Sequence, residues 1–553
     1  MNKKDFIERA LGKVKCDTVL KGGKIIDVLG HSIYEGDVGI YEDVIVGVGD
    51  YQGNEEIDVS GMYIAPGLID SHIHIESTML SPTAFAELVL SKGVTSVFAD
   101  PHEIANVKGE EGLDFMLQNG KNTPLDIYYM LPSCVPATPF EHNGAVIDAE
   151  KTKQLYEKGG FYGLAEMMNY PGLLNCDEDV LKKLDICPYI DGHAPLLSGK
   201  RLNAYAGCGI TNDHECSTVA EVYEKIKTGL NIFIREGTGA KNLDVIMECV
   251  TPYTLPHFAF CTDDKQTGAI IKEGTIGHCI NKAIDKGLDL ISAYTIGSIN
   301  AAKIYGLKKT GAIAPGYKAD IIVNKTKYVK DPEYVFKNGK IVARKGEALF
   351  KTNLVNIESV SNTVNIKDFT TSDLSLEFTK DTPVIEIKEN SLISQLAKGK
   401  GRSEVSLCIN MERHNATGNI GKCYVSGFTV KNGAIAQTIG HDSHNITALG
   451  SDEKNIELAI KSLGKEGGIA LVEDCKLKAF LKLDIAGLMS TAEPKELAKQ
   501  YQALTEKVEA LSPEGSETIM MVLTFISLLV IPHYKLSDRG IFDVDRFQFY
   551  ENV

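Results

Sequence analysis

Two histidines and a glutamate stand on alternate positions of the segment PGLIDSHIHIES, residues 66–77. Side chains alternate between the two faces of a β-strand, so His72, His74 and Glu76 are expected to point the same way. The gap of one residue would let both imidazoles converge on a single metal ion. Glu76 lies further along and is expected to support the loop. The plain alternative is a pair of half-buried histidines satisfied by their neighbours.

Other strand-like runs of the sequence also end in histidines and carboxylates. They supply Asp100, His102, Glu103, Glu166, Asp191, His193, Asp213, His214, Glu215, Arg235, Glu236, Asp263 and Asp264. Imidazole with carboxylate suits Zn, Fe or Mn, and no cysteine spacing supports a structural zinc site. Four histidines with Glu166 and Asp263 are enough for two metals that share one bridging carboxylate. Such a centre favours hydrolytic attack at an electrophilic carbon, with a carboxylate moving the proton.

The elements that must position these residues follow a repeating pattern. From residue 66 to about 304, eight apolar strand-like runs alternate with amphipathic helical runs, which is typical of βα units around a parallel sheet. Their number and length predict an α/β fold with a (β/α)8 TIM-like barrel, whose active site lies at the C-terminal ends of the strands. An open doubly wound sheet is the rival, but no GxGxxG follows the first strand.

The rest of the chain predicts two further domains. Short strands in residues 1–65 and 305–351 are expected to form one discontinuous small β-sandwich domain around the barrel of residues 66–304. A polar stretch at 352–370 is typical of a linker. Residues 371–553 are expected to form an additional C-terminal α/β domain.

Composition limits the classes of function. The 553 residues carry a net charge of -16, which argues against a nucleic-acid surface. The longest apolar run, residues 519–531, is too short to cross a membrane and predicts a buried helix. Twelve cysteines without regular spacing, and no signal peptide at the N-terminus, favour a reduced protein of the cytoplasm.

Three stretches resemble the amidohydrolase superfamily. PGLIDSHIH is similar to its metal motif on the first strand, and His193, His214 and Asp263 follow the family order on strands five, six and eight. The segment AYTIGSINAAKIYGLKKTGAIAPGYKADIIV resembles the passage from the last barrel helices into the β domain. The resemblance covers roughly residues 15–350.

Within that superfamily the chain resembles the bacterial adenine deaminase family over nearly its whole length. The motifs are FADPHEIANV, GLAEMMNYPG, TNDHEC, FCTDD, MERHNATGNIG and GHDSHNI. The resemblance implies two divalent metal ions, with Mn favoured over Fe or Zn. It assigns one metal to His72, His74 and Asp263 and the other to His193 and His214, with Glu166 bridging.

Two departures separate the chain from other relatives. Dihydroorotase-like and urease-like enzymes bridge their metals with a carboxylated lysine, but the fourth strand here offers Glu166 and no lysine. Adenosine deaminase carries a glutamate shortly after its strand-five histidine, whereas HAPLLSG at residues 193–199 contains no carboxylate. The acid that protonates the purine ring must come from elsewhere, and Glu103 is the candidate.

The activity implied by the resemblance is hydrolytic deamination of adenine to hypoxanthine and ammonia by metal-activated hydroxide, as in purine salvage. Asp263 would accept the proton of the water, and Glu103 with His102 would assist at the ring. The expected readers of the substrate are His102, Glu103, Arg235 and Glu236. The alternatives are hydrolysis of a cyclic amide or another amino-heterocycle, and a non-catalytic relative.

Several residues keep two interpretations. Arg235 and Glu236 could instead pair with each other, and Asp264 could orient a metal-bound histidine. Two C-terminal groups, Glu412 with His414 and His441 with His444, could close the active site, hold another ion, or form a polar turn. Asp100, Asp191 and Asp213 are expected to set turns, cap helices or orient neighbours, and His142 to lie at the surface. A homo-oligomer, such as a dimer, is expected, with no nucleic-acid or membrane partner.

Overall fold

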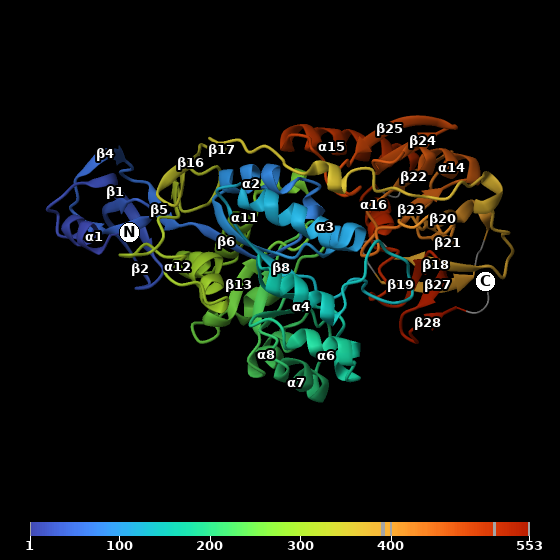
Figure 1. Cartoon of the computed structure of the whole chain (residues 1–553), viewed down its shortest axis with the longest axis horizontal. Helices are drawn as coiled ribbons and strands as arrows, with labels where there is room; N and C mark the ends of the chain where they lie inside the picture. Colours follow the sequence, from blue (N-terminus) through green and yellow to red (C-terminus); the bar gives the residue numbers. More distant parts are fainter. Residues whose placement is uncertain (1, 389–392, 399–400, 513–515, 551–553) are drawn as a thin grey trace.

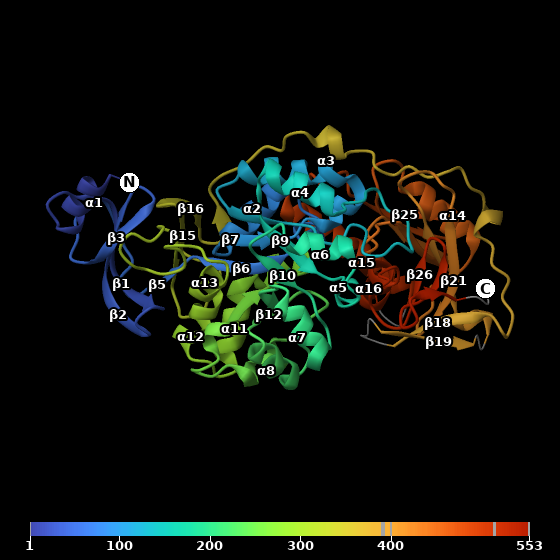
Figure 2. The same cartoon turned by 60° about the horizontal axis from the view of Figure 1, so that its bottom comes forward.

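The computed structural model describes residues 2–388, 393–398, 401–512 and 516–550, so the outermost residues of the two expected end domains lie outside it. Figures 1 and 2 show three bodies in a row. The N-terminal β-sheet lies at one end, the parallel strands lie in the middle, and the C-terminal sheet lies at the other end. The described chain begins in the first of these bodies and ends in the last.

The first body is a nine-stranded sheet built from both ends of the first 350 residues. Its strands follow the order β17-β16-β15-β14-β5-β1-β2-β3, with β4 paired to β1. The strand bounds are β1 Cys16–Asp27, β2 Ser32–Tyr41, β3 Val44–Gly49, β4 Gly53–Asp58, β5 Tyr63–Pro66, β14 Ile321–Asn324, β15 Tyr334–Lys337, β16 Lys340–Arg344 and β17 Glu347–Ala348. The antiparallel pair β5 and β14 joins the two parts of the chain. Helix α1, Lys3–Ala10, precedes the sheet.

Eight short parallel strands form the middle body. They are β6 Leu68–Ile73, β7 Val94–Ala99, β8 Asp126–Leu131, β9 Phe161–Met167, β10 Ile190–Gly192, β11 Asn212–Asp213, β12 Asn231–Arg235 and β13 Phe258–Cys261. Every residue of β6 and β7 is buried, as expected for strands covered on both faces. Of the strand-like run at residues 185–193, only the three residues of β10 adopt a strand in the structure.

The eight strands close into a ring. Neighbours pair in chain order from β6 to β10 and from β11 to β13. The amide of Thr211 donates to the carbonyl of Ile190, which joins β10 to the start of β11. A parallel bridge between Ile73 and Asp263 joins β13 back to β6. The (β/α)8 barrel is therefore complete, with the ends of β6 and β13 side by side at its seam.

Helices follow the strands and cover the ring. They are α2 Pro82–Ser91, α3 His102–Lys121, α4 Ala149–Lys158, α5 Tyr170–Leu174, α6 Glu178–Leu184, α7 Gly199–Gly207, α8 Val219–Lys227, α9 Leu243–Ile246, α10 Thr267–Glu273, α11 Ile276–Asp285, α12 Leu290–Thr295 and α13 Ala301–Ile304. The sequence encodes their ends locally. In α8, for example, the side chains of Thr218 and Glu221 each accept from the other's backbone, a capping box.

A long connection with two short 3-10 helices, Ile357–Val360 and Thr371–Leu374, leads to the third body. Its main sheet has the order β19-β18-β21-β20-β23-β22-β24-β25. The bounds are β18 Pro383–Ile387, β19 Ser394–Lys398, β20 Ser406–Met411, β21 Ile420–Ser426, β22 Gly433–Gln437, β23 Ile446–Gly450, β24 Gly468–Glu473 and β25 Lys476–Lys482. Helix α14, Glu453–Ser462, packs on this sheet.

The end of the chain adds helix α15, Pro494–Leu511, helix α16, Ser516–Phe525, and a small sheet of β26 Tyr534–Ser537, β27 Gly540–Asp543 and β28 Gln548–Phe549. The buried helix expected at 519–531 ends at Phe525, and turns continue to Pro532. Ile526 and Leu529 in these turns are still buried, so the apolar run marks core and not helix length. Within the described residues no helix is long and apolar enough to cross a membrane.

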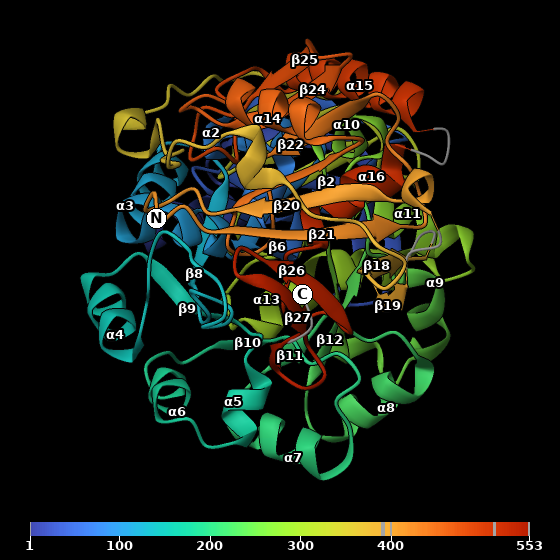
Figure 3. The same ribbon diagram turned by 90° about the vertical axis from the view of Figure 1, so that its right-hand side faces the viewer.

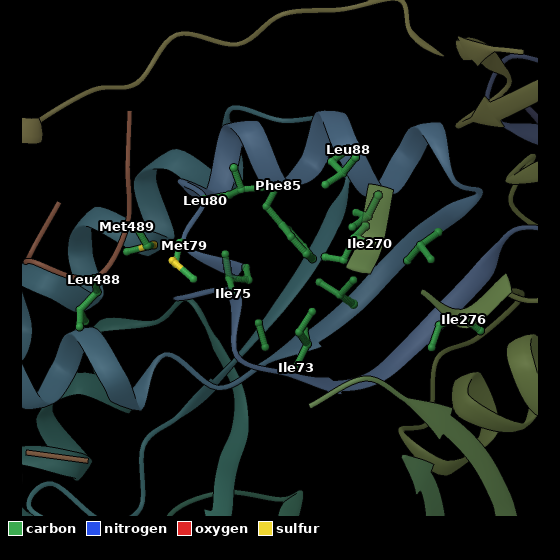
Figure 4. Packing of buried hydrophobic residues seen from close by; sticks show 14 of the residues in the cluster. Ile73, Ile75, Met79, Leu80, Phe85, Leu88, Ile270, Ile276, Leu488 and Met489 are labelled. Atoms are coloured by element: carbon green, nitrogen blue, oxygen red, sulfur yellow. The ribbon is translucent and has the colours of Figure 1, made fainter. Parts of the chain in front are cut away.

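The third body packs against the barrel. In Figure 3 it lies in front of the barrel strands. Figure 4 shows Leu488 and Met489 of this body next to Met79 and Leu80, which follow the barrel strand β6. The backbone joins them as well, because the amide of Ser490 donates to the carbonyl of Met79. The segment after β6 is therefore held in place by both bodies.

We expect Leu80→Ala to lower the free energy of unfolding by about 2–5 kcal/mol, because Leu80 is fully buried in this junction and its loss would leave a cavity. The measurement is the urea midpoint followed by intrinsic tyrosine fluorescence. Leu349→Ala is the control, since Leu349 is 59% exposed, and a change of at most about 0.5 kcal/mol is expected there. Equal shifts in both variants would contradict the packing described.

Candidate metal centre

The seam of the barrel brings His72, His74 and Asp263 together. The amide of Asp263 donates to the carbonyl of His72, and the amide of His74 donates to the carbonyl of Asp263. These backbone bonds place the Asp263 Oδ1 atom 3.5 Å from His72 Nε2 and 3.1 Å from His74 Nε2. All three side chains are at most 7% exposed. They form one group that could hold a metal ion.

Glu166, near the end of β9, lies between two pairs of histidines. Its Oε1 atom is 3.3 Å from His74 Nε2 and 3.9 Å from His72 Nε2. Its Oε2 atom is 2.7 Å from His193 Nδ1 and 3.3 Å from His214 Nε2. One carboxylate oxygen therefore faces each histidine pair. All six residues expected as metal ligands from the sequence lie in this one cluster.

The orientation of the rings leaves nitrogen atoms for an ion. His74 Nδ1 donates to the carbonyl oxygen of Asp100 at 3.0 Å, so Nε2 is the ring nitrogen that faces Glu166 and Asp263. The buried His72 Nε2 has no hydrogen-bond partner among the described residues. Buried polar atoms are rarely left unpaired. Imidazole nitrogens that face carboxylate oxygens form a donor set that fits a divalent metal such as Zn, Fe or Mn.

The electrostatics of the cluster follow from its burial. Burial alone would raise the pKa of Glu166, but His193, His214 and His74 together hold this pKa well below its usual value. Burial likewise opposes ionisation of Asp263, and Arg235, His72 and His74 outweigh it, so the pKa of Asp263 is also well below its usual value. Both carboxylates are therefore ionised over the physiological range of pH.

Glu215, which the sequence analysis left without a role, joins the cluster through Arg235 at the end of β12. The Arg235 guanidinium contacts both oxygens of Glu215, and its Nη1 atom donates to Asp263 Oδ2 at 2.6 Å. Glu215 Oε1 is 3.4 Å from His214 Nε2. His193, His214 and Glu215 form a further group that could hold a metal ion. The signal in the sequence was the motif NDHE, in which Glu215 directly follows a candidate ligand.

Glu236 does not reach the cluster, although the sequence analysis expected it to read the substrate. Its carboxylate accepts from Lys282 on α11 at 3.0 and 3.1 Å. The physical reason is the alternation of side chains along β12. Phe233 and Arg235 face the barrel interior, whereas Ile234 and Glu236 face the helices. Arg235 and Glu236 do not pair with each other.

His102 and Glu103, at the start of α3, lie beside the first metal group. His102 Nδ1 is 2.9 Å from Asp100 Oδ2 and 3.8 Å from Glu166 Oε1. Glu103 is 1% exposed and contacts His441 Nδ1 and His444 Nε2 of the C-terminal body. The C-terminal histidines of unassigned role thus meet an expected substrate reader. Glu76 supports the same helix, because its Oε1 atom accepts from the amide of Ile104.

The remaining polar residues make contacts outside the ligand cluster. Asp264 accepts from Ser77 Oγ at 2.5 Å, Asp191 accepts from Tyr305 and Asn212, and Asp213 accepts from the buried Lys225. His142, expected at the surface, is half-buried, and its Nδ1 atom lies 2.6 Å from Asp538 Oδ2 on the C-terminal body.

A closed (β/α)8 barrel with imidazoles and carboxylates at the C-terminal ends of its strands is the architecture of a metal-dependent hydrolase. The sequence model of the amidohydrolase family matches residues 63–256 and 253–342. That of the adenine deaminase C-terminal domain matches residues 381–548. The class of the protein is therefore that of an amidohydrolase with an added C-terminal domain.

Known relatives narrow this class. The chain is 42% identical to an adenine deaminase of Clostridium acetobutylicum, with 98% of this chain and 99% of that protein covered. It is 41% identical to an adenine deaminase of Thermosipho melanesiensis, with 99% and 98% covered. An adenine deaminase of Halalkalibacterium halodurans is 38% identical, again with 99% and 98% covered. The chain belongs to the adenine deaminase family.

We expect Glu166→Gln to weaken binding of divalent metal by at least about 100-fold, because a neutral amide cannot offset the charge of two cations. The measurement is the metal content of the purified protein by mass spectrometry, alongside far-ultraviolet circular dichroism to check the fold. Glu157→Gln, on an exposed helix position, is the control and should keep its metal. Unchanged metal content in Glu166→Gln would exclude a ligand role for Glu166.

Arg235, the last residue of β12, and Glu236, which follows it, give a second, matched comparison. Arg235→Gln removes the partner of two buried carboxylates, which typically costs about 3–5 kcal/mol, and we expect kcat/KM to fall by about 100-fold. Glu236→Gln changes only the helix side of the strand, so kcat/KM should stay within about 3-fold of the parent while Tm falls. The opposite pattern would mean that Glu236 faces the substrate.

Proposed function

We propose that this protein is a metal-dependent aminohydrolase that converts adenine and water to hypoxanthine and ammonia. The observation that carries the proposal is the full-length similarity to adenine deaminases, and it is supported by one cluster that contains all six residues expected as ligands. The overall reaction breaks the bond from C6 to the amino nitrogen and forms a bond from C6 to oxygen.

Two divalent ions are proposed, with Mn favoured over Fe or Zn. His72, His74 and Asp263 would hold one ion, His193 and His214 would hold the other, and Glu166 would bridge them. The positions of the two Glu166 oxygens, one toward each histidine pair, support this arrangement. Such ions supply a water of lowered pKa and polarise the bond under attack.

The residues of the chain would handle the protons. Asp263 would accept the proton of the water and pass it to the leaving amine; Arg235 donates to its Oδ2 atom and orients the carboxylate. His102 and Glu103 would read the purine ring and assist its protonation at N1. Both are buried beside the seam, and neither is among the six proposed metal ligands. Arg235 would also border the substrate.

We further propose the domain boundaries 1–65 with 305–351 for the small β-sandwich, 66–304 for the barrel and 371–553 for the C-terminal domain. The shared sheet of β1–β5 and β14–β17 supports the discontinuous first domain. The protein is proposed to act as a homo-oligomer, such as a dimer, in the cytoplasm. Irregularly spaced, reduced cysteines support that location.

The direct test is an assay with adenine on apo protein and on protein loaded with Mn, Fe or Zn. We expect ammonia release and the ultraviolet change of adenine to hypoxanthine only in the loaded forms. Rates of about 1–1000 per second are usual for enzymes. A five-membered cyclic diamide is assayed alongside adenine as the alternative substrate. Ring opening of that compound, with adenine untouched by every loaded form, would favour the cyclic-amide alternative.

A further inference from the structure

A loop of the C-terminal domain, residues 440–445, reaches the carboxylate of Glu103. His441 contacts the Glu103 Oε1 atom through Nδ1, and His444 contacts the Oε2 atom through Nε2. The three side chains are between 1% and 8% exposed. Each oxygen of Glu103 therefore has an imidazole partner from a domain whose sequence lies more than 300 residues away.

The same loop also contacts His102. Asp442 Oδ1 lies 3.8 Å from His102 Nε2, and the other ring nitrogen of His102 lies 2.9 Å from Asp100 Oδ2. The Nδ1 atom of His102 is in turn 3.8 Å from the Oε1 atom of Glu166, the proposed bridging residue. The loop is thus separated from the metal cluster by only one layer of side chains, and that layer consists of His102 and Glu103, two of the four expected substrate readers.

Hydrogen bonds from Arg413 and His414 hold the backbone of the loop 440–445 in place. The fully buried Arg413 donates to the carbonyl oxygens of His444, Thr438 and Ala486. The Nε2 atom of His414 donates to the carbonyl of Ser443 at 2.8 Å. Glu412 accepts from the amides of residues 414, 415 and 417. The motif MERH, residues 411–414, therefore supports the motif GHDSH, residues 440–444.

The apolar run after residue 518 supports His441 as well. The amide of His441 donates to the carbonyl of Thr524, and the hydroxyl of Ser527 donates to the carbonyl of His441. The His441 ring stacks on Phe525 with centroids 5.0 Å apart. One face of the imidazole is thereby occupied, so rotation of the ring away from Glu103 is opposed by packing.

We propose that the loop 440–445 is part of the active site and that His441 and His444 are positioning residues, which fix the Glu103 carboxylate for its contact with the substrate ring. This inference rests on the proposed function. A carboxylate on the first turn of a helix can rotate about three side-chain bonds, and contacts with two fixed imidazoles, one of them a hydrogen bond from His444, oppose that rotation. The added domain then contributes to catalysis directly.

The test compares variants that remove the imidazole of His441 or His444 with variants that replace it by an amide group. Asparagine can place an amide near the position of Nδ1, and glutamine can place one near Nε2. His441→Ala and His444→Ala should each lower kcat for adenine by about 100-fold with two metals per chain retained. His441→Asn and His444→Gln should recover about 10-fold of that loss, which a purely structural role would not produce.

Coupling to Glu103 provides the second measurement. In the Glu103→Gln background, His441→Ala should change kcat by less than about 3-fold, because the group that it positions is already gone. His533→Ala is the matched control, since His533 also contacts a carboxylate, Asp545, but on the exposed surface of the same domain. Its kcat should stay within about 2-fold of the parent.

The outcomes separate the inference from the proposed function. A parent that does not deaminate adenine overturns the proposed function, whereas an active parent with a fully active His441→Ala variant overturns only the inference. Three metals per chain, falling to two in His441→Ala, would also overturn it, because His102, Glu103, His441 and Asp442 would then hold an ion. If the alanine variants do not fold, hydrogen exchange of residues 440–445 decides. Exchange should be faster in Glu103→Gln, and unchanged protection overturns the inference.

Discussion

A single buried carboxylate sets the requirements for the rest of the structure. Glu166 is 4% exposed and would be unstable as an anion without partners, because burial of an unpaired charge costs several kcal/mol. Its two oxygens need positive partners on two sides. Those partners, the histidine pairs His72 with His74 and His193 with His214, come from three different strand ends. Only a closed barrel brings these ends around one point.

The closure of the barrel and the chemistry of the cluster therefore depend on the same bonds. The bridge that joins β13 to β6 is formed by the backbone of Asp263, whose side chain is also a proposed ligand. The φ angle of Asp263 is 54°, in the left-handed region that few residues other than glycine adopt. Strain of this kind is maintained where the surrounding structure overdetermines the backbone. Here the surrounding structure is the barrel seam itself.

The sequence predicted the barrel and the ligand cluster because both depend on short-range patterns. Alternating side chains paired His72 with His74, and polar residues at the ends of apolar runs marked the other candidate ligands. The same alternation applied to Arg235 and Glu236 shows that adjacent residues cannot both face the interior, which is why Glu236 lies with Lys282. The contact of Glu103 with His441 and His444 could not be predicted, since no local pattern encodes a pairing across 300 residues.

The shared sheet of the first domain has a consequence for biosynthesis. Strand β5 ends at Pro66, and its neighbour β14 begins at Ile321, which pairs with Pro66. On the ribosome the edge of β5 stays open while the whole intervening barrel is translated, an interval on the order of tens of seconds. An open strand edge invites pairing with other chains. The β5 edge of the nascent N-terminal sheet is thus open to such pairing until β14 has been synthesised.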